Sequence, residues 1–431
     1  MSIGLRLLAK LSSPTEEPER LLERMATWIQ YKCAEVLPRT RRGFVESFPT
    51  LFCKFHPGAE EVELSLADPE HLIASANTST VGPGYHIYLC SVLVDLARDF
   101  QASWQHPDDD SDDYSDEADY FFTGDGQRVF DNMTAWLKAL AGTFFEDFAE
   151  QDLTGNTLCM PMDVVFESAD SVITPLGPRD RAWLEKTSRD GESGKDFFAW
   201  WTPGLTAEYF LGRALTQMWR NVRWRAPVND AEREVLRQTA DSLHRAYQLD
   251  PSLQYPWAEW AEILGYLDTD DATAHLVRAH RSGVATLGYR RGSVTVVLPG
   301  GWRMCLPGSF SEFEADESND LFALDPPKKV WFTAYKFNEP LSHSEFASRR
   351  QEMLAARPQY LRESDHYVAK ATVQRRTTEA GEDYFLLSSS NLFASGRSVC
   401  SMVFSRSEEL DSVLEIWKSI QPRAASTSES T

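Results

Sequence analysis

Hydrophobic residues recur at three- and four-residue intervals in several stretches of the chain, which is the spacing of one buried helical face. The clearest case runs from Pro18 to Val36, where Leu22, Met25 and Ile29 fall on one side. Proline is tolerated in the first turn of a helix, so Pro18 suits its position. The same periodicity predicts helices over Tyr85–Phe100, Val129–Phe148, Leu205–Val222, Asp230–Leu249, Ser342–Ala356 and Ser407–Ile420, with Asp230 as an N-cap.

Other stretches alternate polar and apolar residues with a period of two, which predicts β-strands. The expected strands are Glu61–Leu66, Leu72–Asn77, Gly292–Leu298, Lys329–Phe337, His366–Arg376, Asp383–Ser389 and Arg397–Phe404. Helical patterns dominate the first two-thirds of the chain, and strand patterns dominate the rest. We therefore predict an α+β protein, with a mostly helical N-terminal region that holds a small sheet, followed by an antiparallel-sheet domain with helices on one face.

Three parts follow from this order. Residues 1–285 are predicted to form a mostly helical α+β domain with an acidic loop at 105–120. Residues 286–421 are predicted to form the antiparallel α+β domain. Residues 422–431 read RAASTSEST after Pro422 and are expected to be a disordered tail.

The C-terminal part contains an apolar strand, Val296-Val297-Leu298, followed directly by Pro299-Gly300-Gly301-Trp302, and it ends in a helix that contains Trp417. This pattern resembles the PsbP-like fold, including the small chaperone-like domains found beside type VI secretion effectors. The resemblance covers residues 286–421 only. It implies a fold used mostly for binding, and it carries over no catalytic residue.

Charge is distributed unevenly along the 431 residues. The chain holds 43 Lys and Arg against 65 Asp and Glu, a net charge of −22. Residues 101–170 alone hold 17 acidic and two basic side chains, a net charge of −15, and the stretch from Gln101 to Asp119 is the most acidic. Phosphate binding needs a basic surface, so this balance disfavours nucleic acid and anionic membranes as partners. Like charges repel each other, so we expect a solvated loop or a partner-facing arm.

A concentrated acidic patch suits a basic protein partner and speeds association by electrostatic steering. The chain as a whole looks like a two-domain immunity-type protein of bacterial toxin systems. We expect it to bind a cognate toxin, such as a basic nuclease, and to neutralise it by occlusion. The predicted partner-binding residues are Asp108, Asp109, Asp110, Asp112, Asp113, Asp116, Glu117 and Asp119. A calcium loop would need glycine at its sixth position, where Asp113 stands.

Two further sets of residues keep other functions open. His86 and Cys90 share one face of a predicted helix that follows Gly82-Pro83-Gly84, so a Cys–His dyad in a cleft near Gly82–Cys90 would make the protein an enzyme or a small-molecule binder. Packing in the core is the alternative. Trp219 and Arg223 belong to a basic, aromatic stretch, which would either brace the protein internally or contact a partner of a chaperone-like adaptor.

The sequence lacks the motifs of metal sites, cofactor sites, common enzymes and signal peptides. The six cysteines, Cys33, Cys53, Cys90, Cys159, Cys305 and Cys400, form no C-x-x-C pair, so we expect no metal and no cofactor. No nucleotide, hydrolase or metalloprotease motif occurs, which favours a protein that is not an enzyme. Arg6 and Lys10 interrupt the apolar N-terminus, so we expect no signal peptide, reduced cysteines and a cytoplasmic location.

Overall fold

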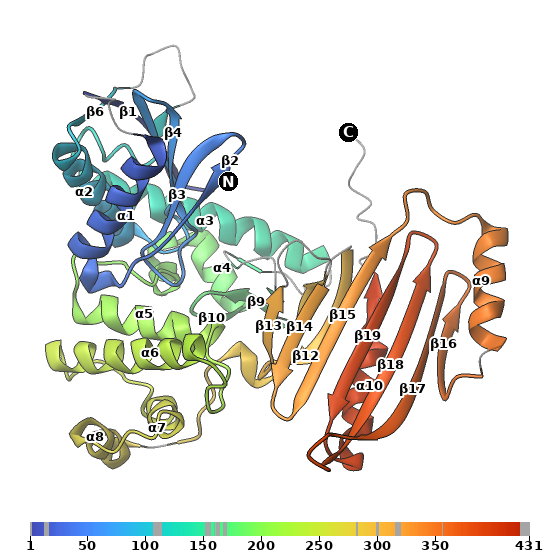
Figure 1. The fold of residues 1–431 in the computed structure, drawn as a ribbon. Helices are drawn as coiled ribbons and strands as arrows, with labels where there is room; N and C mark the ends of the chain where they lie inside the picture. Colours follow the sequence, from blue (N-terminus) through green and yellow to red (C-terminus); the bar gives the residue numbers. More distant parts are fainter. Residues whose placement is uncertain are drawn as a thin grey trace. The chain divides into compact units, whose positions relative to one another are not determined.

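Figure 1 shows a computed structural model that describes residues 2–12, 17–106, 114–150, 157–158, 160, 164–166, 170–281, 283–298, 301–314, 320–355 and 357–422. The chain divides into two compact units. Unit 1 comprises residues 1–160, 168–222 and 234–288, and unit 2 comprises residues 161–167, 223–233 and 289–431. The last division falls between Gly288 and Tyr289, close to residue 285, where the sequence places it. The two short segments that unit 2 takes from the earlier part of the chain were not predicted.

Unit 1 is built on an antiparallel sheet of seven strands in the order β2-β3-β4-β5-β1-β6, with β7 also paired to β1. The strands are β1 (Gly4–Leu11), β2 (Arg39–Val45), β3 (Phe48–Lys54), β4 (Val62–Asp68), β5 (His71–Asn77), β6 (Ala102–Trp104) and β7 (Ser115–Asp116). Two of these, β4 and β5, were predicted. The sheet is therefore larger than the small sheet that the sequence led us to expect.

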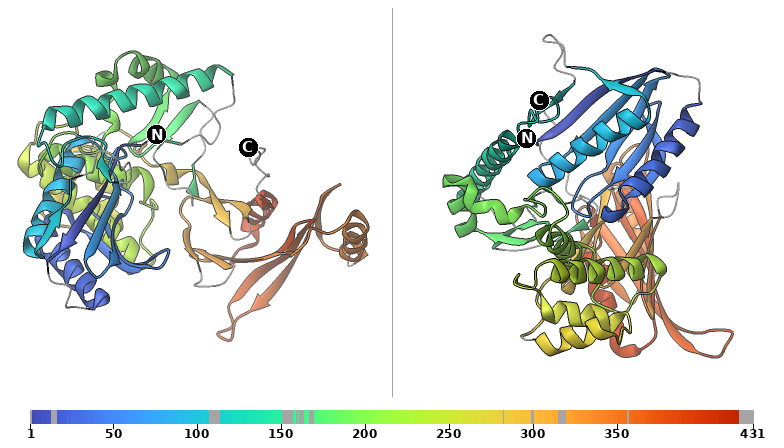
Figure 2. Two further views of the ribbon diagram at one scale, coloured as in Figure 1. Left: turned by 90° about the horizontal axis from the view of Figure 1, so that it is seen from above. Right: turned by 90° about the vertical axis from the view of Figure 1, so that its left-hand side faces the viewer.

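Strand β1 shows why this sheet has two different faces. Leu5, Leu7 and Ala9 are buried, whereas Arg6 and Lys10 between and after them are exposed. Side chains alternate across a strand, so this pattern gives one apolar and one polar face. Helices α1 (Pro18–Lys32), with the short helix η1 (Ala34–Val36) after it, and α2 (Pro83–Asp99) lie along one side of the sheet (Figure 2, right).

The rest of unit 1 is mainly helical. Its elements are the hairpin β9 (Ser171–Thr174) and β10 (Gly177–Asp180), and the helices α3 (Gly126–Glu150), α4 (Arg181–Arg189), η2 (Gly191–Phe197), α5 (Ala207–Arg220), α6 (Asp230–Leu249), α7 (Trp257–Tyr266) and α8 (Ala272–His280). The first turn of α6, up to Arg233, belongs to unit 2. Met133 and Leu137 of α3 pack with Leu184 and Phe197 in one apolar cluster. The predicted α3, α5 and α6 are confirmed. At the start of α6, however, the side chain that accepts the Glu232 N–H is that of Asn229 (2.8 Å).

A buried histidine lies where the loop after β3 meets α5. The Nδ1 atom of His56 accepts the Gly58 N–H (3.1 Å), and the guanidinium groups of Arg213 and Arg220 donate to the carbonyls of Phe55 (3.4 Å) and Pro57 (3.2 Å). Burial, and the nearby positive charges of these arginines, hold the pKa of His56 well below its usual value. The imidazole is therefore neutral at physiological pH.

Unit 2 contains two antiparallel sheets. The larger has the order β13-β14-β15-β19-β18-β17-β16, and the smaller has the order β20-β12-β11-β8. Their strands are β8 (Val164–Val165), β11 (Ser293–Leu298), β12 (Trp302–Pro307), β13 (Ser311–Glu314), β14 (Asp320–Asp325), β15 (Lys328–Lys336), β16 (Tyr360–Ser364), β17 (Tyr367–Thr377), β18 (Asp383–Phe393), β19 (Gly396–Phe404) and β20 (Gln421–Pro422). Trp302 of the smaller sheet packs against Phe332 and Phe393 of the larger one, with 6.1 Å and 5.1 Å between the ring centroids.

The helices of unit 2 are η3 (Tyr289–Arg291), α9 (His343–Ala355), η5 (Ser407–Glu409) and α10 (Leu410–Ser419). Trp417 of α10 is buried, as are Val413 and Leu414, so the predicted apolar face of the closing helix is confirmed. The α+β fold class is confirmed as well. Strands β13 and β14 lie in the acidic stretch Glu312–Asp320 and beyond it, where no strand was predicted. Of the predicted tail, residues 423–431 lie outside the described residues.

Within the described residues, none of the helices has the length and apolar character that crossing a bilayer requires.

Candidate functional site

The acidic segment that the sequence singles out is only partly described. Asp108, Asp109, Asp110, Asp112 and Asp113 lie outside the described residues. Asp116, Glu117 and Asp119 lie within them, and the structure places these three in different surroundings.

Asp116 points into the protein, and its side chain is 2% exposed. Its Oδ1 accepts the Ala118 N–H (2.9 Å), and its Oδ2 accepts those of Tyr120 and Phe121 (2.7 Å each). Burial alone would raise the pKa of this carboxyl, but the hydrogen bonds from His86 and from the backbone outweigh it and lower the pKa. The carboxylate is therefore ionised and holds the turn that follows it, and it is not presented to a partner.

His86 and Cys90 lie one turn apart on α2, and both are buried. The Nε2 atom of His86 is 3.2 Å from Oδ1 of Asp116, and its Nδ1 is 2.9 Å from Oγ1 of Thr78. Burial raises the pKa of the Cys90 thiol, so the thiol stays protonated. A catalytic cysteine needs a lowered pKa to form its thiolate. The geometry brings the predicted Cys–His pair together but gives it no activated nucleophile.

The glycine turn before α2 is packed inside the protein. Every residue from Gly82 to His86 is buried. A Cβ atom on Gly84 would lie 2.4 Å from the ring of Trp200, and Gly82 has a φ of +119°. The Gly84 N–H donates to the Trp200 carbonyl (3.0 Å). Close packing against Trp200 thus accounts for these glycines, and an anion or substrate at this helix start would have to displace Trp200.

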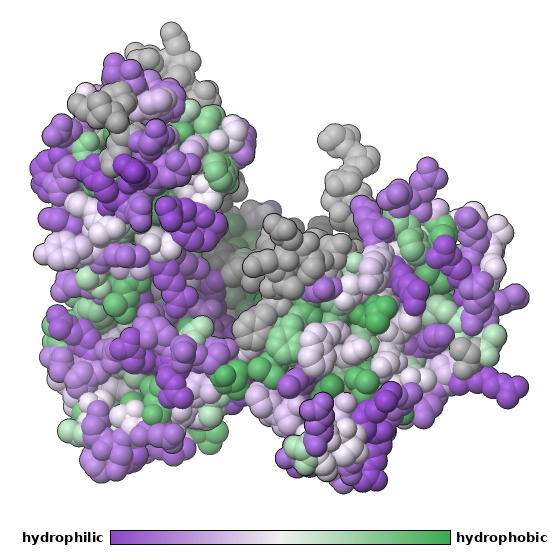
Figure 3. Space-filling model, viewed as in Figure 1, coloured by the Kyte–Doolittle hydropathy of each residue, from purple (hydrophilic) through white to green (hydrophobic). Residues whose placement is uncertain are grey.

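Glu117 emerges on the polar face of the unit 1 sheet, where it borders a surface pocket of about 460 Å³. Strands β1, β4, β5 and β7 contribute to this pocket, which is lined by Ser2, Gly4, Leu5, Arg6, Glu60, Glu61, Glu63, Ser75, Ala76, Asn77, Ser115 and Glu117. Four of these side chains are carboxylates and one is a cation. We call Glu60, Glu61, Glu63 and Glu117 the acidic pocket. In Figure 3, hydrophilic side chains predominate on the visible face of unit 1.

Strand register explains how these residues meet. Ser75 of β5 stands opposite Arg6 on one side and Glu63 on the other, so alternate residues of three neighbouring strands share one face. Glu117 follows β7, which pairs with β1, and its Oε2 accepts the Gly4 N–H (2.6 Å). Glu61 forms two hydrogen bonds with Arg41. Sequence reasoning missed the glutamates in and just before β4, because their role depends on strands far away in the chain.

The side chain of Asp119 is about half exposed and forms an ion pair with Arg128 at the start of α3. Trp219 of α5 packs over the hairpin of β9 and β10, where a Cβ atom on Gly177 would lie 2.9 Å from its ring. Trp219 is therefore partly buried within unit 1.

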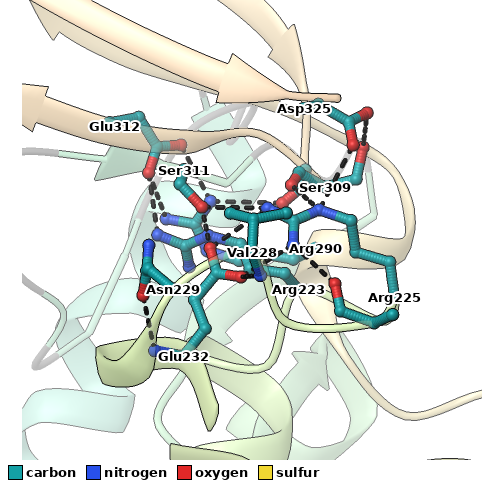
Figure 4. A network of polar contacts seen from close by, with 12 residues as sticks. Arg223, Arg225, Val228, Asn229, Glu232, Arg290, Ser309, Ser311, Glu312 and Asp325 are labelled. Atoms are coloured by element: carbon teal, nitrogen blue, oxygen red, sulfur yellow. Dashed lines mark hydrogen bonds and ion pairs between the residues drawn. The ribbon is translucent and has the colours of Figure 1, made fainter. Parts of the chain in front are cut away.

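Arg223 belongs to a network of buried ion pairs in unit 2 (Figure 4). Glu312 of β13 binds both Arg223 and Arg290 (2.9 Å each). Burial, followed by the charge of Arg290, lowers the pKa of Arg223 to about 10, so it remains a cation at neutral pH. Arg223 therefore braces unit 2 internally.

Arg225 is the second centre of this network. It binds Glu232 (2.7 Å) and Asp325 (3.2 Å), and its Nε donates to the carbonyl of Ser309 (2.8 Å). Ser311 also hydrogen-bonds to Glu232. The segment 223–233 is thus joined to the loops and strands around β13 and β14 by charged hydrogen bonds, which matches the internal brace among the alternatives from sequence.

No protein-family model and no curated protein matches the chain. Among solved structures, the chain is similar to a crystal structure from Bacteroides thetaiotaomicron VPI-5482, with 17% identity and a TM-score of 0.25, over 31% of this chain and 49% of that one. The match thus spans about half of that protein. It is also similar to the solution structure of cyanobacterial PsbP (CyanoP) from Synechocystis sp. PCC 6803, with 10% identity and a TM-score of 0.15, over 28% of this chain and 86% of that one.

A PsbP protein is therefore among the similar structures. TM-scores this low carry no argument about fold or function, and the PsbP-like character of residues 286–421 stays a prediction.

Proposed function

We propose that the chain is an immunity-type protein that binds a basic toxin, such as a nuclease, and neutralises it by occlusion. The observation that supports this best is the acidic pocket on the polar face of the unit 1 sheet. It adds three glutamates from the region of β4 to Glu117, an exposed residue of the acidic segment that the sequence singles out.

The chemistry of such a pocket selects for a cation. Four carboxylates around a pocket of about 460 Å³, with Arg6 as the cation among the lining residues, give a negative potential that suits a lysine or arginine side chain of a partner. Surfaces that bind nucleic acid phosphates are rich in these side chains. A protein that covers such a surface would block access of the nucleic acid without performing any reaction.

If the acidic pocket attracts a basic partner by electrostatic steering, the association rate should depend on salt concentration. Purified products of the genes that neighbour this one serve as probes, and the association rate is measured between 0.05 and 0.5 M salt. Screening shortens the reach of charges from about 10 Å at 0.1 M to about 3 Å at 1 M salt. We expect the association rate to fall by at least roughly tenfold over this range.

A charge-matched pair of variants tests the location. The double variant Glu60→Gln/Glu63→Gln changes the acidic pocket, and Glu352→Gln/Glu382→Gln changes two exposed glutamates of unit 2 by the same net charge. We expect the first to slow association and the second to leave it unchanged. An association rate that changes neither with salt concentration nor in Glu60→Gln/Glu63→Gln would overturn the proposal.

A further inference from the structure

His86, Cys90 and Asp116 form an enclosed cluster of the residue types that bind zinc. One potential ligand atom from each, the imidazole Nε2, the thiol sulfur and a carboxylate oxygen, lies within 4.8 Å of the other two. The side chains of His86 and Asp116 are 0% and 2% exposed. Histidine nitrogen, cysteine sulfur and carboxylate oxygen are the ligands that zinc takes from proteins. We propose that this cluster is a binding site for a zinc-class divalent cation.

The spacing between His86 and Asp116 suits a shared ion. Nε2 lies 3.2 Å from Oδ1 and 3.4 Å from Oδ2. A charge-assisted hydrogen bond from nitrogen to a carboxylate is usually 2.7–2.9 Å long. Two ligands bound to one tetrahedral zinc at about 2.0–2.2 Å stand about 3.3–3.6 Å apart. The observed separation is therefore that of two neighbouring ligands, and it is longer than a typical direct bond.

The groups behind the ligands hold them in place. Three backbone N–H groups orient the Asp116 carboxylate. Thr78 Oγ1 lies 2.9 Å from Nδ1 of His86 and 3.2 Å from the Ile3 carbonyl. The Thr78 hydroxyl donates to the Ile3 carbonyl, so Oγ1 can accept a proton from Nδ1 and leave Nε2 as the nitrogen that binds the metal. Such partners behind a metal-binding histidine fix its tautomer and orientation.

The charges and protons also balance. Without metal, the cluster holds the Asp116 carboxylate and the protonated Cys90 thiol beside the imidazole of His86. Binding converts the Cys90 thiol into a thiolate and releases its proton, and Nε2 of His86 gives up any proton it carries. The divalent cation, the thiolate and the carboxylate then sum to zero charge, which favours a site in the protein interior. A non-protein ligand completes the tetrahedron.

This ion would connect α2 to the C-terminal end of the acidic segment, so its role would be structural. It does not depend on the proposed function. Cobalt is a suitable probe, because a cobalt–thiolate bond gives a charge-transfer absorption that a histidine–aspartate hydrogen bond cannot give. The full chain is freed of metal by a chelator and titrated with cobalt and then with zinc.

We expect a charge-transfer band that saturates at one cobalt per chain and disappears on adding zinc. We also expect at least one proton released per zinc, that of the Cys90 thiol, and a melting temperature that rises with zinc concentration. Cys90→Ser should lose the band. Cys53→Ser removes another buried thiol of unit 1, outside the cluster, and should keep it.

The measurements on the unaltered protein decide the matter even if a variant fails to fold. Absence of the charge-transfer band, or zinc binding without release of a proton, would overturn the proposal. The cluster would then be a histidine–aspartate hydrogen bond beside a packed thiol.

Discussion

The two units bury charge in different ways. In unit 1, one carboxylate, that of Asp116, is enclosed by backbone N–H groups and a histidine. In unit 2, three arginines and three carboxylates satisfy one another in a network (Figure 4). The first arrangement is mostly local, because its backbone donors lie within five residues of Asp116. The second joins segments that are far apart in the sequence, because Arg223 and Arg225 reach residues beyond 300.

This difference determines what the loss of one side chain does. A carboxylate held by backbone dipoles can lose its charge and keep part of its hydrogen bonding. A carboxylate shared by two buried arginines leaves both with too little compensating charge when it is removed. We therefore expect unit 2 to be the more sensitive of the two to charge removal.

The largest effect is expected for Glu312→Gln. Glu312 is 11% exposed and binds Arg223 and Arg290, so its neutralisation weakens the compensation of two buried cations. We expect the free energy of unfolding to fall by about 3–5 kcal/mol, measured by urea denaturation. Glu352→Gln, on the exposed side of α9, is the control and should change it little. A loss below about 1 kcal/mol would show that the rest of the network compensates both arginines.

Asp116→Asn in the metal-free protein should have the next largest effect. The amide keeps one acceptor oxygen, but its NH₂ group then faces donors that the carboxylate had satisfied. We expect a loss of about 2–3 kcal/mol in the free energy of unfolding, measured as for Glu312→Gln. A larger loss here than in Glu312→Gln would reverse the ranking of the two units.

His56 of unit 1 stays neutral in the folded protein, so its protonation should make stability depend on pH. The pKa of His56 is held well below its usual value by burial and by Arg213 and Arg220. Below about pH 6.5 the unfolded chain binds a proton at this residue and the folded chain does not. The free energy of unfolding should therefore fall as pH decreases, by about 1–2 kcal/mol between pH 6.5 and 5.

His56→Asn identifies this contribution, because asparagine can still accept the Gly58 N–H but does not titrate. Unfolding is followed at a series of pH values for both proteins. We expect a shallower pH dependence in the variant. Equal slopes would mean that His56 is protonated in the folded protein.

The smallest effect is expected for Asp119→Asn, three residues after Asp116. Both members of its ion pair with Arg128 are about half exposed, so solvent screens their attraction. We expect a change below about 0.5 kcal/mol in the free energy of unfolding. A loss as large as that of Asp116→Asn would show that the whole segment, rather than the single buried carboxylate, is structural.

The sequence predicted the fold class and most helices because their apolar residues keep a helical period. Strand β1 was not predicted, although its buried residues Leu5, Leu7, Ala9 and Leu11 alternate with less buried ones. Arg6 and Lys10 lie among the less buried residues, and in the sequence they look like interruptions of an apolar segment. Those charges mark the polar face of a strand.

The site was harder to predict. Asp116 lies in a run of like charges, and nothing in that run distinguishes the buried carboxylate from its neighbours. Its distinguishing partner, His86, lies 30 residues earlier in the chain. The glutamates in and just before β4 likewise join Glu117 only through the strand order of the sheet.

The discontinuity of unit 2 has a consequence for synthesis on the ribosome. Strand β8 and the arginines at 223 and 225 leave the exit tunnel well before β11, β13 and β14, the elements they pair with. Unit 1 is interrupted only by these short segments, so its parts can associate while unit 2 is still incomplete. A nascent chain therefore carries Val165 of β8 for 130 codons before its partner Thr295, and Arg223 for 89 codons before Glu312, and a fragment that begins at residue 289 would never contain these two segments.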